Sequence, residues 1–226
     1  MAVDYFTKWV EVEALANIRD VDVKKFVWKN IITRFGMLDS LISDNGLQFD
    51  SKAFREFCSD LEIKNRYSTP VYPQGNGQAE ATNKAIVNGL KKKLGDAKGR
   101  WSEELPNVLW AYRTTPKRST EESPFSLTYE AEAVTPAEVN LCSARVAAFV
   151  PAQNERLMVE RLDLLEEYRE VASIILAEYQ QKLPQRYNHD VKTREFSVRG
   201  PNVTESSREY AGYKCWEVSP NLGRPL

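Results

Sequence analysis

The chain of 226 residues carries 31 Lys and Arg against 32 Asp and Glu, and 42% of its residues are hydrophobic. This length suits one domain of about 150 residues with an appendage, or two small domains. No run of eighteen apolar residues occurs, so no membrane span is indicated, and the first residues lack the organisation of a signal peptide. Because the net charge is only −1, any contact with nucleic acid must come from local basic patches.

The cysteines and the histidine limit the chemistry further. Cys58, Cys142 and Cys215 are odd in number and far apart, which indicates reduced intracellular thiols rather than a disulfide framework. The single histidine, His189, leaves no zinc site built from His and Cys residues. We therefore expect an intracellular protein whose chemistry depends on other side chains.

The first 68 residues alternate between strand patterns and helix patterns. The segments are residues 2–13 (two strands with a turn near Thr7), 20–35 (helix), 37–43 (strand), 51–61 (helix) and 63–68 (edge strand). This alternation predicts an α/β protein with a sheet flanked by helices.

Two carboxylates follow this pattern at the ends of predicted elements. Asp44 lies after a short apolar strand and before Asn-Gly, and Glu80 follows a Gly-Asn-Gly loop and opens a helix, with 35 residues between the two acids. A pair of carboxylates is what a site for Mg²⁺ requires. Surface turns and helix starts also carry acids routinely, so the spacing alone leaves both interpretations open.

The predicted helix from residue 78 to residue 94 adds a local basic excess. Residues 84–100 contain six basic residues and one acid, and they include Lys84 and Lys91. Such an excess could neutralise DNA phosphates. For Lys91 the alternative is a solvated helix end that the helix dipole favours.

Three longer segments resemble a known family. The segments SDNGLQF, STPVYPQGNGQAEATNK and WAYRTTPKRSTEESPFSLTYE resemble the integrase catalytic core of Ty3/gypsy-type LTR retrotransposons, within the retroviral integrase superfamily. The resemblance covers roughly residues 1 to 190. It implies an RNase H-like mixed sheet flanked by helices and an Asp-Asp-Glu site for Mg²⁺ or Mn²⁺. In that site Asp44 is the second acid and Glu80 is the third.

The resemblance also implies an activity and partners. The activity is DNA integration by phosphoryl transfer, with 3′-end processing followed by strand transfer, and the partners are element ends and target DNA. Lys84 would contact DNA, with Asn83 and Lys91 beside it on the same helix. A functional protein of this kind would act in the nucleus.

Some positions depart from the family pattern. Val87 stands where some relatives carry a second basic residue, and Glu121 and Glu130 stand where relatives carry glycines. We expect backbone strain at the two glutamates if the turns need a positive φ.

The first acid of the family site needs separate treatment. Asp4 precedes Asp44 by 39 intervening residues, but the resemblance places Asp4 in the second strand of the fold. The first strand, which carries the catalytic Asp and lies between the second and fourth strands, would precede Met1. We therefore expect a truncated core that lacks this strand, binds metal weakly and performs no strand transfer.

The remaining organisation follows from these expectations. We predict a partial catalytic core at residues 1–130, a linker at 131–153, a long helix or helical hairpin at 154–184 and a degenerate, poorly ordered tail at 185–226. A seven-residue apolar repeat within residues 155–183 favours either a coiled coil, which would allow a homo-oligomer, or packing on the core. Two other functions stay open, a remnant that only binds DNA or itself, and an RNase H-like nuclease.

Overall fold

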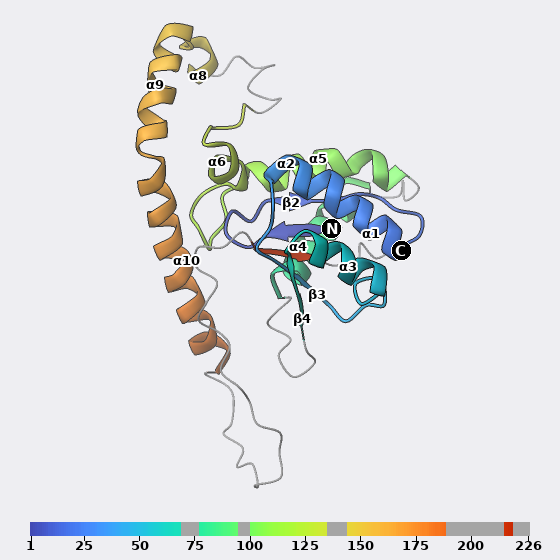
Figure 1. Ribbon diagram of the computed structural model, residues 1–226. Coiled ribbons are helices and arrows are strands. Elements are labelled where there is room, and N and C mark those ends of the chain that lie inside the picture. Colours follow the sequence, from blue (N-terminus) through green and yellow to red (C-terminus); the bar gives the residue numbers. More distant parts are fainter. Residues whose placement is uncertain (69–76, 95–99, 135–143, 189–214, 219–226) are drawn as a thin grey trace.

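The computed structural model describes residues 1–68, 77–94, 100–134, 144–188 and 215–218 (Figure 1). The strands are β1 (Ala2–Asp4), β2 (Val10–Glu11), β3 (Ser40–Ser43), β4 (Lys64–Tyr67) and β5 (Cys215–Val218). The helices are α1 (Asp20–Val27), the π-helical η1 (Trp28–Ile32), α2 (Thr33–Phe35), α3 (Lys52–Asp60), α4 (Gly77–Leu94), α5 (Trp101–Thr114), α6 (Pro124–Tyr129), α8 (Ala144–Ala147), α9 (Pro151–Asp163) and α10 (Leu165–Asn188). In these ranges no helix is long and apolar enough to cross a membrane.

The strands form one mixed sheet in the order β2-β1-β5-β3-β4. β1 and β2 pair antiparallel, whereas β3 and β4 pair parallel and are connected through α3. β5 lies between these two pairs, antiparallel to β1 and parallel to β3. The predicted α/β sheet with flanking helices is confirmed.

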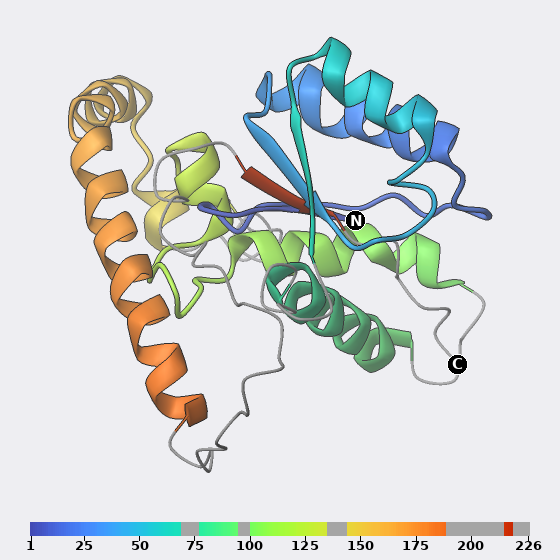
Figure 2. The ribbon, with the colours of Figure 1, turned by 60° about the horizontal axis from the view of Figure 1, so that its bottom comes forward.

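Two apolar clusters pack the helices onto the sheet. One cluster joins Ala2 and Leu41 to buried side chains of α1, η1 and α3. The other joins Val3 and Val10 to buried side chains of α4 and α5. Because successive residues of a strand face opposite sides, Ala2 and Val3 place the two clusters on opposite faces of the sheet. Figure 2 shows α1 and α3 on one side and α4 and α5 on the other.

Local signals explain several element boundaries. The predicted hairpin turn near Thr7 is present, with the Asp4 amide donating to the Trp9 carbonyl at 2.8 Å. The side chain of Ser51 caps α3 by accepting a hydrogen bond from the Phe54 amide at 3.1 Å. The helical segment that begins at Asp20 stops at Gly36, whose φ is 83°.

The two glutamates that replace glycines lie in left-handed backbone, as the sequence predicts. Glu121 has φ 58° in the turn that leads to α6, and Glu130 has φ 61° at the end of α6. A side chain in this region costs roughly 1–2 kcal/mol relative to ordinary backbone. The strain expected at both positions is therefore present.

The segment after α6 is dominated by α9 and α10. Helical hydrogen bonding continues between them, with the Tyr168 amide donating to the Leu164 carbonyl at 3.1 Å, and Figure 1 shows both along one side of the molecule. Within the predicted apolar repeat, Ala172 is buried against the rest of the protein, whereas Met158 is exposed. α10 continues past Pro184 to Asn188, so the proline does not end the helix.

α10 is also tied to the core by polar contacts. Arg169 contacts the Glu130 carboxylate at 3.1 Å, and the Gln180 amide donates to the Tyr5 hydroxyl at 2.6 Å. Both contacts lie on the exposed surface, so each contributes little by itself.

The C-terminal strand is not predicted from the sequence. The prediction assigns residues 185–226 to a poorly ordered tail, but within this range residues 215–218 form β5. In the family pattern, the first strand lies between the strands that correspond to β1 and β3. β5 occupies that position in the sheet.

Candidate metal and DNA site

Asp44 lies in the turn that follows β3. Its Oδ1 accepts a hydrogen bond from the Gly46 amide at 3.2 Å, which is the side-chain turn that Asp-x-Gly sequences favour. A Cβ atom at Gly46 would lie 3.0 Å from Asp44 Oδ1, so glycine leaves room beside the carboxylate. Asp44 is half-buried and makes no ion pair with another residue in the described ranges. Its second oxygen is available to a ligand.

Asp4 is held in a different way, within the hairpin turn. Its Oδ2 accepts hydrogen bonds from the Thr7 amide at 2.8 Å and from the Thr7 hydroxyl at 2.6 Å. Burial raises the pKa of the Asp4 carboxyl, and the hydrogen bonds from Thr7 oppose that effect. These contacts give Asp4, the last residue of β1, a structural role in the hairpin turn.

Glu80 lies in the first turn of α4 and is exposed. Gln78, one position after the helix start, fixes this end of α4 to the hairpin. Its Nε2 donates to the Asp4 carbonyl at 2.9 Å, and its Oε1 accepts from Lys8 Nζ at 2.5 Å. Glu80 itself has no ion pair with a residue in the described part of the chain.

One face of α4 carries three exposed charged residues and a half-buried valine. At about 100° per residue, Glu80, Lys84 and Lys91 lie within about 40° of one another around the helix axis, and Val87 lies between the two lysines along that axis. Both lysines are exposed and neither pairs with an acid in the part of the chain that the structure describes. We call Glu80, Lys84, Val87 and Lys91 the α4 strip.

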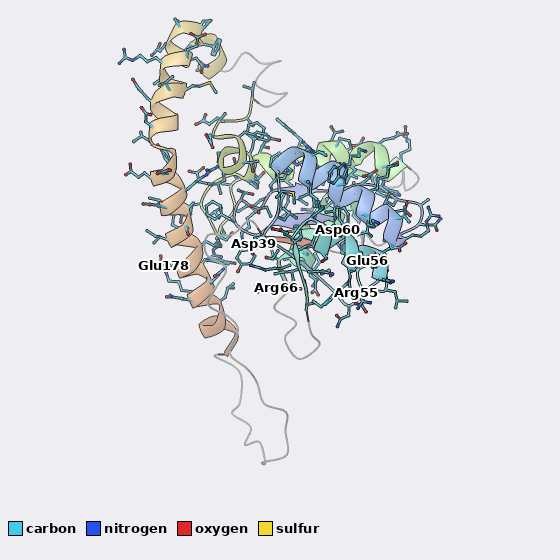
Figure 3. All side chains as sticks on the ribbon, in the orientation of Figure 1. Asp39, Arg55, Glu56, Asp60, Arg66 and Glu178 are labelled. Carbon is cyan, nitrogen blue, oxygen red and sulfur yellow. The ribbon has the colours of Figure 1, made fainter. Side chains whose placement is uncertain are left out.

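The outer face of α3 carries charges that are arranged differently. Figure 3 labels Arg55, Glu56 and Asp60 on this helix, and all three are exposed. Arg55 lies 3.4 Å from Asp50, and Glu56 lies 3.6 Å from Lys52. Charges on α3 are thus partly neutralised by ion pairs, on the helix itself and with Asp50 just before it, unlike those of the α4 strip.

Asn83 lies beside the strip and is less accessible. It is half-buried, and its Oδ1 is fully buried without a hydrogen-bond partner in the described structure. A buried acceptor that is left unpaired costs about 1–3 kcal/mol. Of the three α4 residues predicted to bind DNA, Asn83 is therefore the least accessible to a phosphate.

The donor chemistry of the two acids fits a hard cation. Carboxylate oxygens are the ligands that Mg²⁺ and Mn²⁺ prefer, and Asp44 and Glu80 both keep oxygens that no described side chain uses. The two acids come from separate elements, and no hydrogen bond links Asp44 to α4 in the described ranges. Nor do these ranges contain a cluster of three or more His, Cys, Asp or Glu side chains suited to a metal ion.

Gln78 is the positioning residue that the sequence analysis did not identify. Nothing in its local pattern separates it from the polar residues of the preceding loop. Its positioning role is recognised only from its place at a helix start together with its distant hydrogen-bond partners, Asp4 and Lys8. Contacts between residues seventy or more positions apart leave no local periodicity.

Residues 1–73 match the integrase core domain family. Over 127 residues the chain is 32% identical to the Gag-Pol polyprotein of avian reticuloendotheliosis virus, a match that covers 56% of this chain and 11% of the polyprotein. The Gag-Pol polyprotein of feline leukemia virus is 25% identical over 233 residues, which covers 95% of this chain and 13% of the polyprotein. The chain thus spans only a small part of these relatives.

A solved structure shows the same fold. A chain of the simian T-cell lymphotropic virus intasome, determined in complex with the PP2A regulatory subunit B56 gamma, aligns with a TM-score of 0.51 at 19% identity. The alignment covers 59% of this chain and 48% of that chain. The family match, the polyprotein relatives and this fold confirm that the chain resembles an integrase catalytic core with an RNase H-like fold, while its placement in the Ty3/gypsy group stays a prediction.

Proposed function

We propose that this chain is the DNA-acting core of a retrotransposon integrase of the Ty3/gypsy type. The observation that carries the proposal is the α4 strip, where Glu80 and two exposed lysines lie on one helix face without described partners of opposite charge. Such a face is suited to a ligand that brings both phosphates and a cation. DNA with a bound divalent metal is that ligand.

The acidic and the basic residues have different proposed roles. Asp44 and Glu80 would hold Mg²⁺ or Mn²⁺ through carboxylate oxygens, and Lys84 and Lys91 would position DNA phosphates, with Asn83 beside them. When bound, the metal would supply activation of a water or of a DNA 3′-hydroxyl and would stabilise charge on the attacked phosphate. The reactions are 3′-end processing and strand transfer, with element ends and target DNA as substrates, and their place would be the nucleus.

We further propose that the chain by itself binds metal weakly and does not join DNA. The family site uses three acids, and in this sequence only Asp44 and Glu80 match it. Asp4 serves the hairpin turn through Thr7 and does not supply the third ligand.

The test measures binding of a labelled terminal-repeat duplex by fluorescence anisotropy at several salt concentrations. Lys84→Ala should weaken binding and lower the salt slope by about 1, because one phosphate contact is lost. Val87→Lys should act in the opposite direction, since it extends the strip with a third basic side chain. Lys52→Ala is the matched control, because this exposed lysine of α3 pairs with Glu56.

Metal binding and catalysis provide separate measurements on the same proteins. Titration with Mn²⁺ should show binding that Asp44→Asn and Glu80→Gln each abolish. With Mg²⁺ and the duplex, the unmodified chain should give no joined product. Equal DNA binding by Lys84→Ala and Lys52→Ala, or Mn²⁺ binding that survives Asp44→Asn, would refute the proposed site. Cleavage of an RNA–DNA hybrid would instead favour an RNase H-like nuclease.

A second function, self-association, is favoured by the surface of α9 and α10. Large apolar side chains are exposed there, among them Leu157, Val159, Val171 and Ile174. Of these residues, Val171 and Ile174 are three positions apart on α10 and share one face of that helix, and contiguous exposed apolar residues often mark an interaction site. Sedimentation velocity should show a concentration-dependent homo-oligomer that Ile174→Glu reduces to the monomer, without an effect on DNA binding by the α4 strip.

A further inference from the structure

β5 stands out because it joins two parts of the sheet that have no other strand between them among the described residues. It comes from residues 215–218, whereas its neighbours β1 and β3 come from the first 43 residues. Along β1, Ala2 is opposite Val218 and Asp4 is opposite Trp216. Along β3, Ser40 is opposite Cys215.

The neighbours of β5 are strands that are buried on both faces. Ala2, Val3, Leu41 and Ser43 have no exposed surface. Buried backbone N–H and C=O groups need hydrogen-bond partners, and each strand has two edges to satisfy. β2 and β4 serve the outer edges of β1 and β3, and β5 serves both inner edges.

The sequence of β5 suits this central position. Cys-Trp-Glu-Val contains Trp and Val, which favour strands, and it contains no proline that would interrupt the ladder. A central strand with one antiparallel neighbour and one parallel neighbour uses backbone donors and acceptors on both sides.

We propose that the inner edges of β1 and β3 form a strand-binding site on which the fold depends, and that its occupant, residues 215–218 of the same chain, is required to keep the sheet together. Residues 215–218 then act as a clasp that holds the β1–β2 hairpin to the β3–β4 pair. Recognition is by backbone hydrogen bonds, so the site accepts an extended segment whose amides are free. The proposal is independent of metal or DNA binding.

The first test compares two substitutions at one position of the full-length chain. Glu217→Pro removes a backbone donor from the middle of β5, whereas Glu217→Ala keeps it. In hydrogen–deuterium exchange, Glu217→Pro should speed exchange in the β1 and β3 peptides about tenfold or more, and Glu217→Ala should leave them slow. Equal exchange rates in the two variants would overturn the proposal.

A second test reports the position of β5 without weakening the fold. In a Cys142→Ser background, Ser40→Cys places a thiol opposite Cys215, because these residues pair across the two strands. Ser43→Cys is the matched control, since residue 43 pairs with Val218 and lies three positions, about 10 Å, along the strand from the level of Cys215. A disulfide needs Cα atoms within about 7 Å, so oxidation should link residues 40 and 215 and should not link residues 43 and 215.

The products of oxidation separate the possible occupants. A disulfide within one chain, identified by peptide mass after proteolysis, supports the proposal. Disulfide-linked dimers as the main product would mean that the site takes the strand of a second copy, and they would overturn the assignment to the same chain. Equal yields from Ser40→Cys and Ser43→Cys would show that residues 215–218 have no fixed register, which also overturns it.

Discussion

Two groups of carboxylates in this protein differ in what surrounds them. Glu11, on β2, is buried and accepts hydrogen bonds from Trp9 Nε1 at 2.8 Å, Arg34 at 2.8 Å and Arg113 at 3.1 Å. Asp44 and Glu80 make no ion pair with a cationic side chain in the described part of the chain. The difference indicates that Glu11 is used by the fold, whereas the other two remain available to a ligand.

The largest expected effect is on stability, and it tests whether Glu11 supports the fold. Glu11→Ala should lower the free energy of unfolding by about 3 kcal/mol, because it leaves the half-buried Arg113 guanidinium without its carboxylate partner. Burial already lowers the pKa of Arg113, and Glu11 opposes that effect. The measurement is urea unfolding followed by circular dichroism.

The control for Glu11→Ala is Glu80→Ala. It removes an exposed carboxylate at a helix start, so it should cost less than about 1 kcal/mol. If both substitutions had similar costs, the division into structural and available carboxylates would fail.

Asp4 falls between the two groups and gives a test that depends on pH. Because burial raises its pKa in the folded protein, the folded state binds the proton more tightly than the unfolded state. The charged form therefore costs stability, and this cost is absent below the unfolded pKa near 3.8 and develops as pH rises through the folded value. Asp4→Asn keeps an oxygen that can accept both hydrogen bonds from Thr7, but it carries no charge.

Relative to the unmodified protein, Asp4→Asn should thus gain stability between pH 3 and pH 7. The measurement is the difference in urea midpoint between the two proteins at each pH. A difference that stays constant over this range would mean that the Asp4 carboxyl has no shifted pKa. In that case only the hydrogen bonds from Thr7 would support a structural role for Asp4.

Sequence patterns predict the parts of this protein whose physical causes are local. The helical spacing of Phe54 and Cys58 and the Asp-Asn-Gly turn at Asp44 depend on neighbours a few residues away. The left-handed backbone at Glu121 followed from a single departure from the family pattern. Each of these features is decided before the chain forms distant contacts.

The parts that local patterns do not predict depend on distant contacts. β5 has four residues and no periodicity, and its partners lie more than 170 positions earlier in the chain. The position of the Gln78 side chain depends on its hydrogen bonds with the Asp4 carbonyl and the Lys8 ammonium, which belong to the β1–β2 hairpin. Both features are central to the candidate site, because one completes the sheet and the other fixes the helix that carries Glu80.

The smallest expected effect concerns two glutamates in left-handed backbone, Glu121 and Glu130. Glu121→Gly should raise the free energy of unfolding by about 1 kcal/mol, since glycine adopts its φ of 58° without steric cost. Glu130→Gly should gain less, because it also removes the contact between Glu130 and Arg169 that ties α6 to α10. The matched control is Glu103→Gly within α5, where glycine should instead cost about 1 kcal/mol. Thermal unfolding of the three variants measures the order, and a loss of stability in Glu121→Gly would mean that the Glu121 side chain, like that of Glu11, supports the fold.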